Sequence, residues 1–231
     1  MERNVRASDS GRLCRINMNA IGQGLGFNRQ SGSYRKDKSL KGEFVLFFTK
    51  TKKIYLDRAE LGIDNHPFIL SGSFITGGDE PSFSLSIQTK RINLRKAIGL
   101  LTQNTQKKFN AYDIFQPIDI DAQLNGLTAT GSIPLVGVDF FVKNAEIETP
   151  VGRFNKCSFA GNFTNQIDTA RPRLDDNSKI SLKTFSGKWR SIPITANNVD
   201  ISNLTVPFLK SDLHSSFDLA ELNDLTGNKS I

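Results

Sequence analysis

The chain has 231 residues, of which 38% are hydrophobic and 23% are charged, as in ordinary globular proteins. Seventeen Phe stand against three Tyr and one Trp, so the aromatic side chains are almost all fully apolar. The net charge is +7, and the longest unbroken apolar run, Phe44–Phe48, is far shorter than the ~20 residues that span a bilayer.

Residues 1–11 are polar and lack the apolar centre of a signal peptide, so we expect them to be disordered or the start of a fragment. From residue 12 onward, apolar and polar residues alternate with the period of β-strands. The alternation predicts strands at Arg12–Ile21, Ser39–Thr49, Ile54–Asp64, Pro67–Thr76, Ser82–Thr89, Ile114–Gly131, Ile133–Glu148, Gly152–Asn165, Lys179–Gly187, Ser191–Ser202 and Leu209–Leu219. We therefore predict one mainly β domain over residues 12–231.

One segment departs from this pattern. Between 93 and 112, Leu94, Ala97, Ile98 and Leu101 recur at helical spacing, and Asn93 is a suitable N-cap. The pattern predicts an amphipathic helix near 93–110, inserted in the β domain and packed across the sheet rather than lying on a membrane. A second, short helical turn is expected at 219–225.

Three predicted hairpins resemble one another and begin near Leu56, Val142 and Ala196. In each, a small or β-branched residue (Ala59, Ala145 or Val199) precedes an acidic and then an aliphatic residue, and the return strand ends in Phe. Repeats of this size bury their apolar faces against their neighbours. We therefore expect an extended, curved antiparallel sheet shaped as an open groove, lined by the candidate residues Phe68, Phe74, Phe154, Phe159, Phe163, Phe208 and Phe217.

Several phrases of the sequence are similar to AsmA-like envelope proteins of the Bacteroidetes type. They are Ser33-Tyr34-Arg35-Lys36-Asp37-Lys38-Ser39-Leu40-Lys41-Gly42, Phe115-Gln116-Pro117-Ile118-Asp119-Ile120, Asp176-Asn177-Ser178-Lys179-Ile180, Ser202-Asn203-Leu204-Thr205-Val206-Pro207 and Phe217-Asp218-Leu219-Ala220-Glu221-Leu222-Asn223. The resemblance implies a periplasmic β-groove, anchored to the inner membrane by an N-terminal helix, that supports phospholipid transport or outer-membrane assembly. Because this sequence contains no anchor helix or signal, we expect it to be part of a longer protein, with a phospholipid or another acyl-chain lipid as its partner.

The sequence contains no recognisable catalytic or metal-binding pattern, and we expect no enzyme activity and no cofactor. His66 and His214 lack a second ligand at metal-site spacing, and Gly22–Phe27 lacks the dinucleotide-binding arrangement of glycines. Asp119 and Asp121 would share a strand face near Asp113, which we interpret as an exposed polar face. The spacing of Cys14 and Cys157 predicts two unpaired thiols rather than a disulfide.

Positive charge is concentrated at the start of the chain, where residues 1–60 hold 13 of the 30 Lys and Arg. Four of these, Arg35, Lys36, Lys38 and Lys41, are candidates for binding anionic lipid headgroups. The alternative function is a nucleic-acid-binding β domain that uses this basic third, with Tyr34 and Tyr55 as stacking residues. We favour the lipid interpretation because the Phe residues at 44–48 are expected to be buried.

Overall fold

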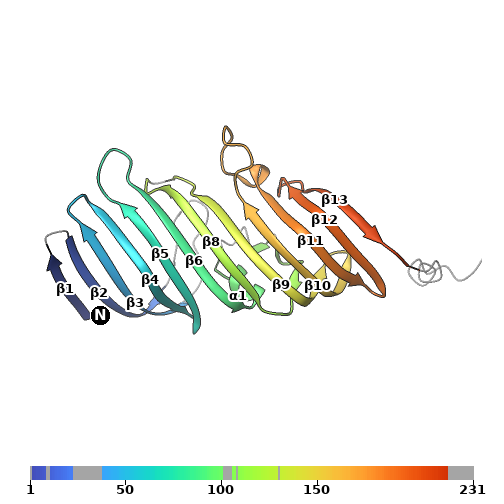
Figure 1. The fold of residues 1–231 in the computed structure, drawn as a ribbon, viewed down its shortest axis with the longest axis horizontal. Helices are drawn as coiled ribbons and strands as arrows, with labels where there is room; N and C mark the ends of the chain where they lie inside the picture. The colour runs from blue at the N-terminus through green and yellow to red at the C-terminus, as the bar shows by residue number, and fades with distance from the viewer. Residues whose placement is uncertain are drawn as a thin grey trace, which may run out of the picture.

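The computed structural model consists almost entirely of one antiparallel sheet, and it describes residues 2–8, 11–22, 38–100, 106–107, 109–129 and 131–217. Its strands are β1 Glu2–Ser8, β2 Gly11–Gly22, β3 Lys38–Thr49, β4 Lys53–Ile63, β5 His66–Ile75, β6 Ser82–Ile92, β7 Asp113–Ile114, β8 Ile118–Leu127, β9 Leu135–Thr149, β10 Gly152–Thr164, β11 Lys179–Trp189, β12 Ile192–Ser202 and β13 Phe208–Ser215. The sheet is an open, curved meander in which each long strand pairs with its neighbours in sequence, and the short β7 pairs with β9 (Figure 1). The predicted fold class is therefore confirmed.

Two details of the sequence-based prediction need correction. A strand, β1, forms at Glu2–Ser8, where we expected disorder or the start of a fragment. The helix α1 covers only Leu94–Ile98; Asn93 caps it as predicted, its side chain accepting a hydrogen bond from the Arg95 backbone N–H, but the helix ends at Gly99. Residues 106, 107 and 109 are also helical, whereas 101–105 and the turn expected at 219–225 lie outside the described residues.

The two faces of the sheet differ sharply in chemistry. Residues that are directly opposite on paired strands share a face, and one such row runs across nine strands without a polar residue: Ala59, Leu70, Ile87, Ala122, Val138, Phe163, Ile180, Ile201 and Leu209. We call the side that carries this row the apolar face. The other side, the polar face, carries a parallel row of Glu43, Glu60, Ile69, Gln88, Asp121, Asp139, Asn162, Ser181, Asp200 and Lys210.

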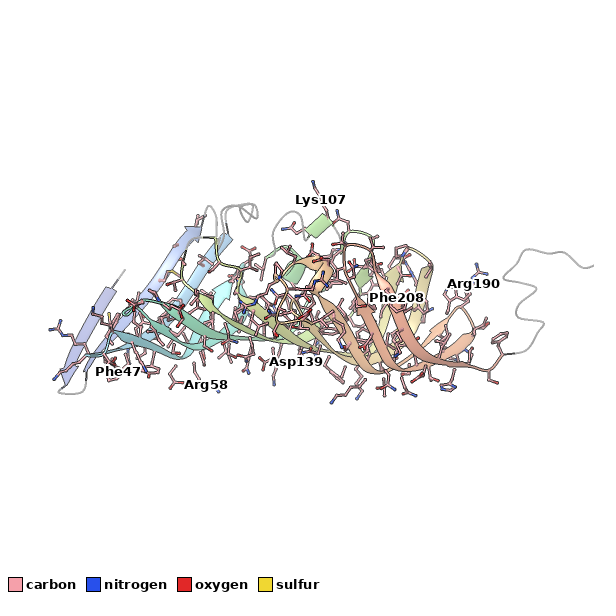
Figure 2. The ribbon with its side chains drawn as sticks, turned by 90° about the horizontal axis from the view of Figure 1, so that it is seen from above. Phe47, Arg58, Lys107, Asp139, Arg190 and Phe208 are labelled. Carbon is pink, nitrogen blue, oxygen red and sulfur yellow. The ribbon has the colours of Figure 1, made fainter. Side chains whose placement is uncertain are left out.

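Helix α1 lies on the apolar face near the ends of β5, β6, β8 and β9. Its Leu94 and Ala97 pack against a buried cluster on those strands, made of Phe68, Ile92, Ile118, Val142 and Ala145. Figure 2 shows Lys107, in the segment that follows the helix, on one side of the sheet, and Asp139 and Arg58 on the other. The helix thus packs on the sheet, and none of the helices in the described part is long and apolar enough to cross a bilayer.

β-Bulges explain how the repeated hairpins keep their apolar residues on one face. Five strand residues followed by a buried residue adopt positive φ, namely Arg58, Arg91, Asn144, Lys156 and Asn198. Each lies at a register shift, where one extra residue is inserted into the strand. The insertion brings residues three apart, such as Val142 and Ala145, to the same face. Ala59, Ala145 and Val199, which marked the sequence repeat, are the buried residues directly after three of these bulges.

At three of the five bulges, a side chain on the neighbouring strand accepts a hydrogen bond from the bulge backbone. The backbone N–H of Asn144 donates to Ser158 Oγ at 2.9 Å, and that of Arg58 donates to Ser71 Oγ at 3.1 Å. The N–H of Arg91 donates to Asp119 Oδ1 at 2.8 Å. Because bulges increase the local bend and twist of a strand, their repetition across the sheet accounts for its curvature.

Candidate functional site

The apolar face is the principal candidate site, and the structure brings most of the predicted groove residues to it. Phe68, Phe74, Phe154, Phe159 and Phe163 are each paired in register with apolar residues of that face. Phe68 is buried near α1, whereas the other four are partly exposed. The apolar surface is therefore continuous over β4 to β12, and its Phe residues lie on β5, β6, β9, β10 and β11.

The remaining two Phe candidates lie elsewhere. Phe208 pairs with Ser202, which places its side chain on the polar face, where it is 66% exposed. Phe217 follows the end of β13 and is 40% exposed. The pairing of Phe208 with Ser202 determines its face, and the sequence repeat did not reveal this because it aligned the hairpins only approximately.

A ladder of aromatic rings crosses the apolar face over β9, β10 and β11. Phe140 contacts Phe159 edge-on with ring centroids 6.2 Å apart, and Phe159 stacks on Phe185 at 5.9 Å. Phe185 in turn contacts Phe154 edge-on at 6.4 Å. Ring contacts of this kind add about 0.5–1.5 kcal/mol each to the burial of the rings. The ladder is thus an apolar surface of packed rings whose side chains carry no hydrogen-bonding group.

The candidate headgroup-binding cations are not assembled beside this surface. Lys41 is exposed on β3, and alternation with the apolar Leu40 places it on the polar face. Arg35 and Lys36 lie outside the described residues, as does the side chain of Lys38. Tyr55, a candidate stacking residue for nucleic acid, pairs with Phe47 on the polar face and is 43% exposed, while Tyr34 is not described.

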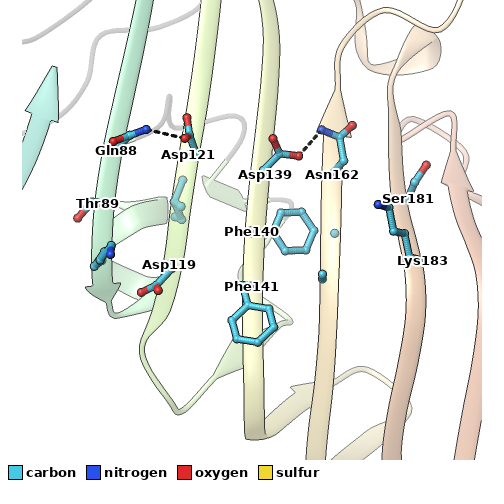
Figure 3. Close-up of a pocket in the computed structure, with 14 residues that line it drawn as sticks. Gln88, Thr89, Asp119, Asp121, Asp139, Phe140, Phe141, Asn162, Ser181 and Lys183 are labelled. Carbon is cyan, nitrogen blue, oxygen red and sulfur yellow. Dashed lines mark hydrogen bonds between the residues drawn. The ribbon is translucent and has the colours of Figure 1, made fainter. Parts of the chain in front are cut away.

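The polar face holds an open depression of about 690 Å³ over β6 to β11 (Figure 3). Asp121 and Asp139 are directly opposite each other across β8 and β9 on its floor. Gln88 Nε2 donates to Asp121 Oδ2 at 2.7 Å, and Asn162 Nδ2 donates to Asp139 Oδ1 at 2.8 Å. These amide donors offset the repulsion between the two carboxylates, and they join β6 to β8 and β9 to β10 through side chains.

The other predicted carboxylates have structural partners. Asp119 shares the polar face with Asp121, as predicted, and accepts the N–H of Arg91. Asp113 lies apart from both on β7, where it pairs with Glu148 of β9, and Arg95 of α1 donates to its Oδ2 at 2.9 Å. Among the described residues, no three His, Cys, Asp or Glu side chains are placed to hold a metal ion.

His66 and the two thiols also occupy structural positions. His66 Nε2 lies 2.8 Å from Thr89 Oγ1, which itself donates to the Pro67 carbonyl, so the His66 nitrogen is the donor. Burial and the nearby Lys96 lower the pKa of His66. Cys14 and Cys157 are free, as predicted, and both are buried; burial raises the pKa of Cys157 to about 11.

Thr89, Asn177 and Ser178 are buried polar residues that the sequence analysis did not identify, and Asn177 makes the most side-chain hydrogen bonds of the three. Asn177, in the loop between β10 and β11, accepts hydrogen bonds at its Oδ1 from the backbone N–H groups of Ile167 and Asp168. Its Nδ2 donates to the carbonyls of Asp168, Arg171 and Pro172. Asn177 therefore organises the loop from within, and the sequence shows only a polar turn because every partner is a backbone group.

Comparison of the chain with protein-family models, with curated proteins and with solved structures finds no significant match.

Proposed function

We propose that this chain is a non-catalytic envelope module whose apolar face binds the acyl chains of lipids, in support of phospholipid transport or outer-membrane assembly. The observation that supports the proposal is the uninterrupted apolar row from Ala59 to Leu209. Seven of its nine residues are partly exposed and one, Leu209, is largely exposed, so the face is not sealed as a closed core would be.

The dimensions of the row suit an acyl chain. Nine strands about 4.8 Å apart make a row roughly 38 Å long, whereas the acyl chains of one bilayer leaflet span about 15 Å. Each buried methylene contributes about 0.8 kcal/mol, so ten methylenes contribute about 8 kcal/mol before the cost of association. Such binding needs a sustained apolar surface rather than a particular residue, which is consistent with the absence of a recognisable motif.

The experiment compares two Phe residues on opposite faces of the sheet. Phe163 belongs to the apolar row between Val138 and Ile180, whereas Phe141 is 51% exposed on the polar face. The wild type, Phe163→Gln and Phe141→Gln are purified from bacterial membranes, and phospholipid that co-purifies is quantified by mass spectrometry. We expect the Phe163 variant to retain several-fold less lipid than the wild type and the Phe141 variant to retain as much.

Circular dichroism of both variants controls for folding. Lipid-free wild-type protein, or equal loss in the two variants, would contradict the proposal. The nucleic-acid alternative is tested with the same preparations by titrating a fluorescent 20-nucleotide single strand at low and high salt. Tight, salt-sensitive binding that depends on Tyr55 would favour that alternative instead.

A further inference from the structure

Strand β13 forms an edge of the sheet that is unusually apolar for an exposed edge. On the apolar face, Leu209 and Leu213 are 61% and 62% exposed, whereas Ala196, the register partner of Leu213 on β12, is 4% exposed. The difference arises because no described strand lies on the outer side of β13. Natural edge strands usually carry devices that prevent pairing with another chain, and two exposed leucines have the opposite effect.

The sequence of β13 is complementary to itself when it is read in the opposite direction. Phe208-Leu209-Lys210 precede Ser211 in the sequence, and Asp212-Leu213-His214 follow it. An antiparallel pair centred on Ser211 therefore matches Leu209 with Leu213, Lys210 with Asp212 and Phe208 with His214, each match occurring twice. Alternation puts both leucine pairs on the apolar face and both charge pairs on the polar face.

We propose that β13 pairs with β13 of a second copy of this chain, antiparallel and in the register centred on Ser211, to form a two-fold symmetric dimer. The symmetry axis passes between the two Ser211 residues, perpendicular to the sheet, as an isologous interface in this register requires. The apolar faces of the two copies then lie on the same side. The apolar row that ends at Leu209 in one copy continues into Leu213 of the other, and from there to its Ala196.

Charge selects this register over its neighbours. A shift that centres the pair on Lys210 places two lysines opposite each other, and one that centres it on Asp212 places two aspartates opposite each other; both arrangements are destabilising. A register shifted by an odd number of residues places the apolar face of one copy on the same side of the joined sheet as the polar face of the other. Among these nearest registers, the one centred on Ser211 pairs Lys210 with Asp212 on the polar face and Leu209 with Leu213 on the apolar face.

Cysteine cross-linking tests the register directly. In the proposed dimer the two Ser211 side chains are opposite, with Cβ atoms about 5 Å apart. Two Ser215 side chains, by contrast, are eight residues apart along the strands, or about 26 Å. We expect Ser211→Cys to be captured as a dimer by a short bifunctional thiol reagent, and Ser215→Cys and the wild type, whose two thiols are buried, to remain uncaptured.

Charge exchange provides a second measurement, made by sedimentation on the full chain. Because one strand pair is a small interface, we expect a concentration-dependent equilibrium with a dissociation constant on the order of micromolar. Lys210→Asp is expected to weaken dimerisation at least tenfold, and Lys210→Asp combined with Asp212→Lys to restore most of it. Lys183→Asp, the same charge change on β11 of the polar face, is expected to have no effect.

Asp212 also accepts a hydrogen bond from Asn198, at 3.0 Å, so the thermal stability of each variant is measured alongside. A protein that stays monomeric at all concentrations, or cross-linking that is equal at positions 211 and 215, would overturn the proposal. The dimer does not depend on lipid binding, because lipid-free protein is used throughout. A failure here therefore leaves the function proposed above untouched.

Discussion

The ring of Phe140 on β9 lies directly over Gly161 on β10, its register partner on the apolar face. A Cβ atom added to Gly161 would come within 2.3 Å of two atoms of this ring and 2.6 Å of Leu182. The ring is held in turn against Phe159, so it has little room to withdraw. Glycine at 161 is thus required by packing rather than by backbone conformation.

Replacement of Gly161 by Ala should therefore destabilise the fold, by about 1–3 kcal/mol, as overpacking does elsewhere. The matched control is Gly137→Ala on β9, where an added Cβ meets nothing within 4 Å. We expect that control to be neutral or to stabilise the protein by up to about 1 kcal/mol. Urea denaturation measures both free energies of unfolding, and equal values for the two variants would contradict this account of Gly161.

The bulges make a second prediction. Ser158→Ala removes the acceptor for the Asn144 N–H, and should cost about 1 kcal/mol of unfolding free energy. Ser84→Ala, an exposed serine on β6 that makes no side-chain hydrogen bond among those of the described residues, is the control and should cost less than about 0.5 kcal/mol. If Ser158→Ala is as stable as its control, the Asn144 N–H does not need that partner.

The thiol of Cys157 should be almost unreactive in the folded protein. Burial raises its pKa to about 11 from an ordinary value of 9.0, so at pH 8 the thiolate fraction falls by about 100-fold. We expect alkylation by iodoacetamide to be slower by at least that factor than in urea-unfolded protein. Peptide mass spectrometry follows Cys157 separately from Cys14, and fast modification of the native protein would show that β10 opens readily.

His66 should make stability depend on pH. Its pKa is lowered in the folded protein by burial and by Lys96, so the unfolded chain takes up the proton first as the pH falls. The contribution of neutral His66 to the free energy of unfolding is fully present above its ordinary pKa of 6.5. This contribution is lost as the pH falls through 6.5 toward the lower pKa of the folded protein. Urea midpoints at pH 7.5 and 5.5 should therefore differ less in His66→Gln than in the wild type.

His214 provides the comparison for this measurement, because it is exposed on the edge strand β13. His214→Gln should retain the wild-type difference between the two pH values. If the urea midpoints of His66→Gln differ between the two pH values as much as those of the wild type, other groups cause the pH dependence.

The strand order and the division of the sheet into two faces could be predicted from the sequence, because alternation is a local property. The eleven predicted strands from Arg12 onward correspond to observed strands within a few residues at most ends. The turn at Asn65 and the cap at Asn93 have equally local causes, namely a residue suited to positive φ and a side chain that bonds the helix N-terminus.

What could not be predicted depends on contacts between distant residues or on exceptions to the alternation. The bulges are visible only in retrospect, as apolar residues spaced three apart: Leu56 and Ala59, or Val142 and Ala145. The helix was predicted too long because Leu101 continued its spacing, whereas α1 ends at Gly99. The placement of Phe208 on the polar face depends on the register of β13, which pairing with β12 determines.

The bulges have one more consequence. Each bulge bends its own strand and is held by a side chain of the neighbouring strand, such as Ser71, Asp119 or Ser158. The curvature of the sheet is therefore set locally at each pair of strands. Adding or deleting a hairpin would lengthen or shorten the trough without altering its cross-section. The length of a sheet of this design can therefore change by duplication of a hairpin without redesign of the rest.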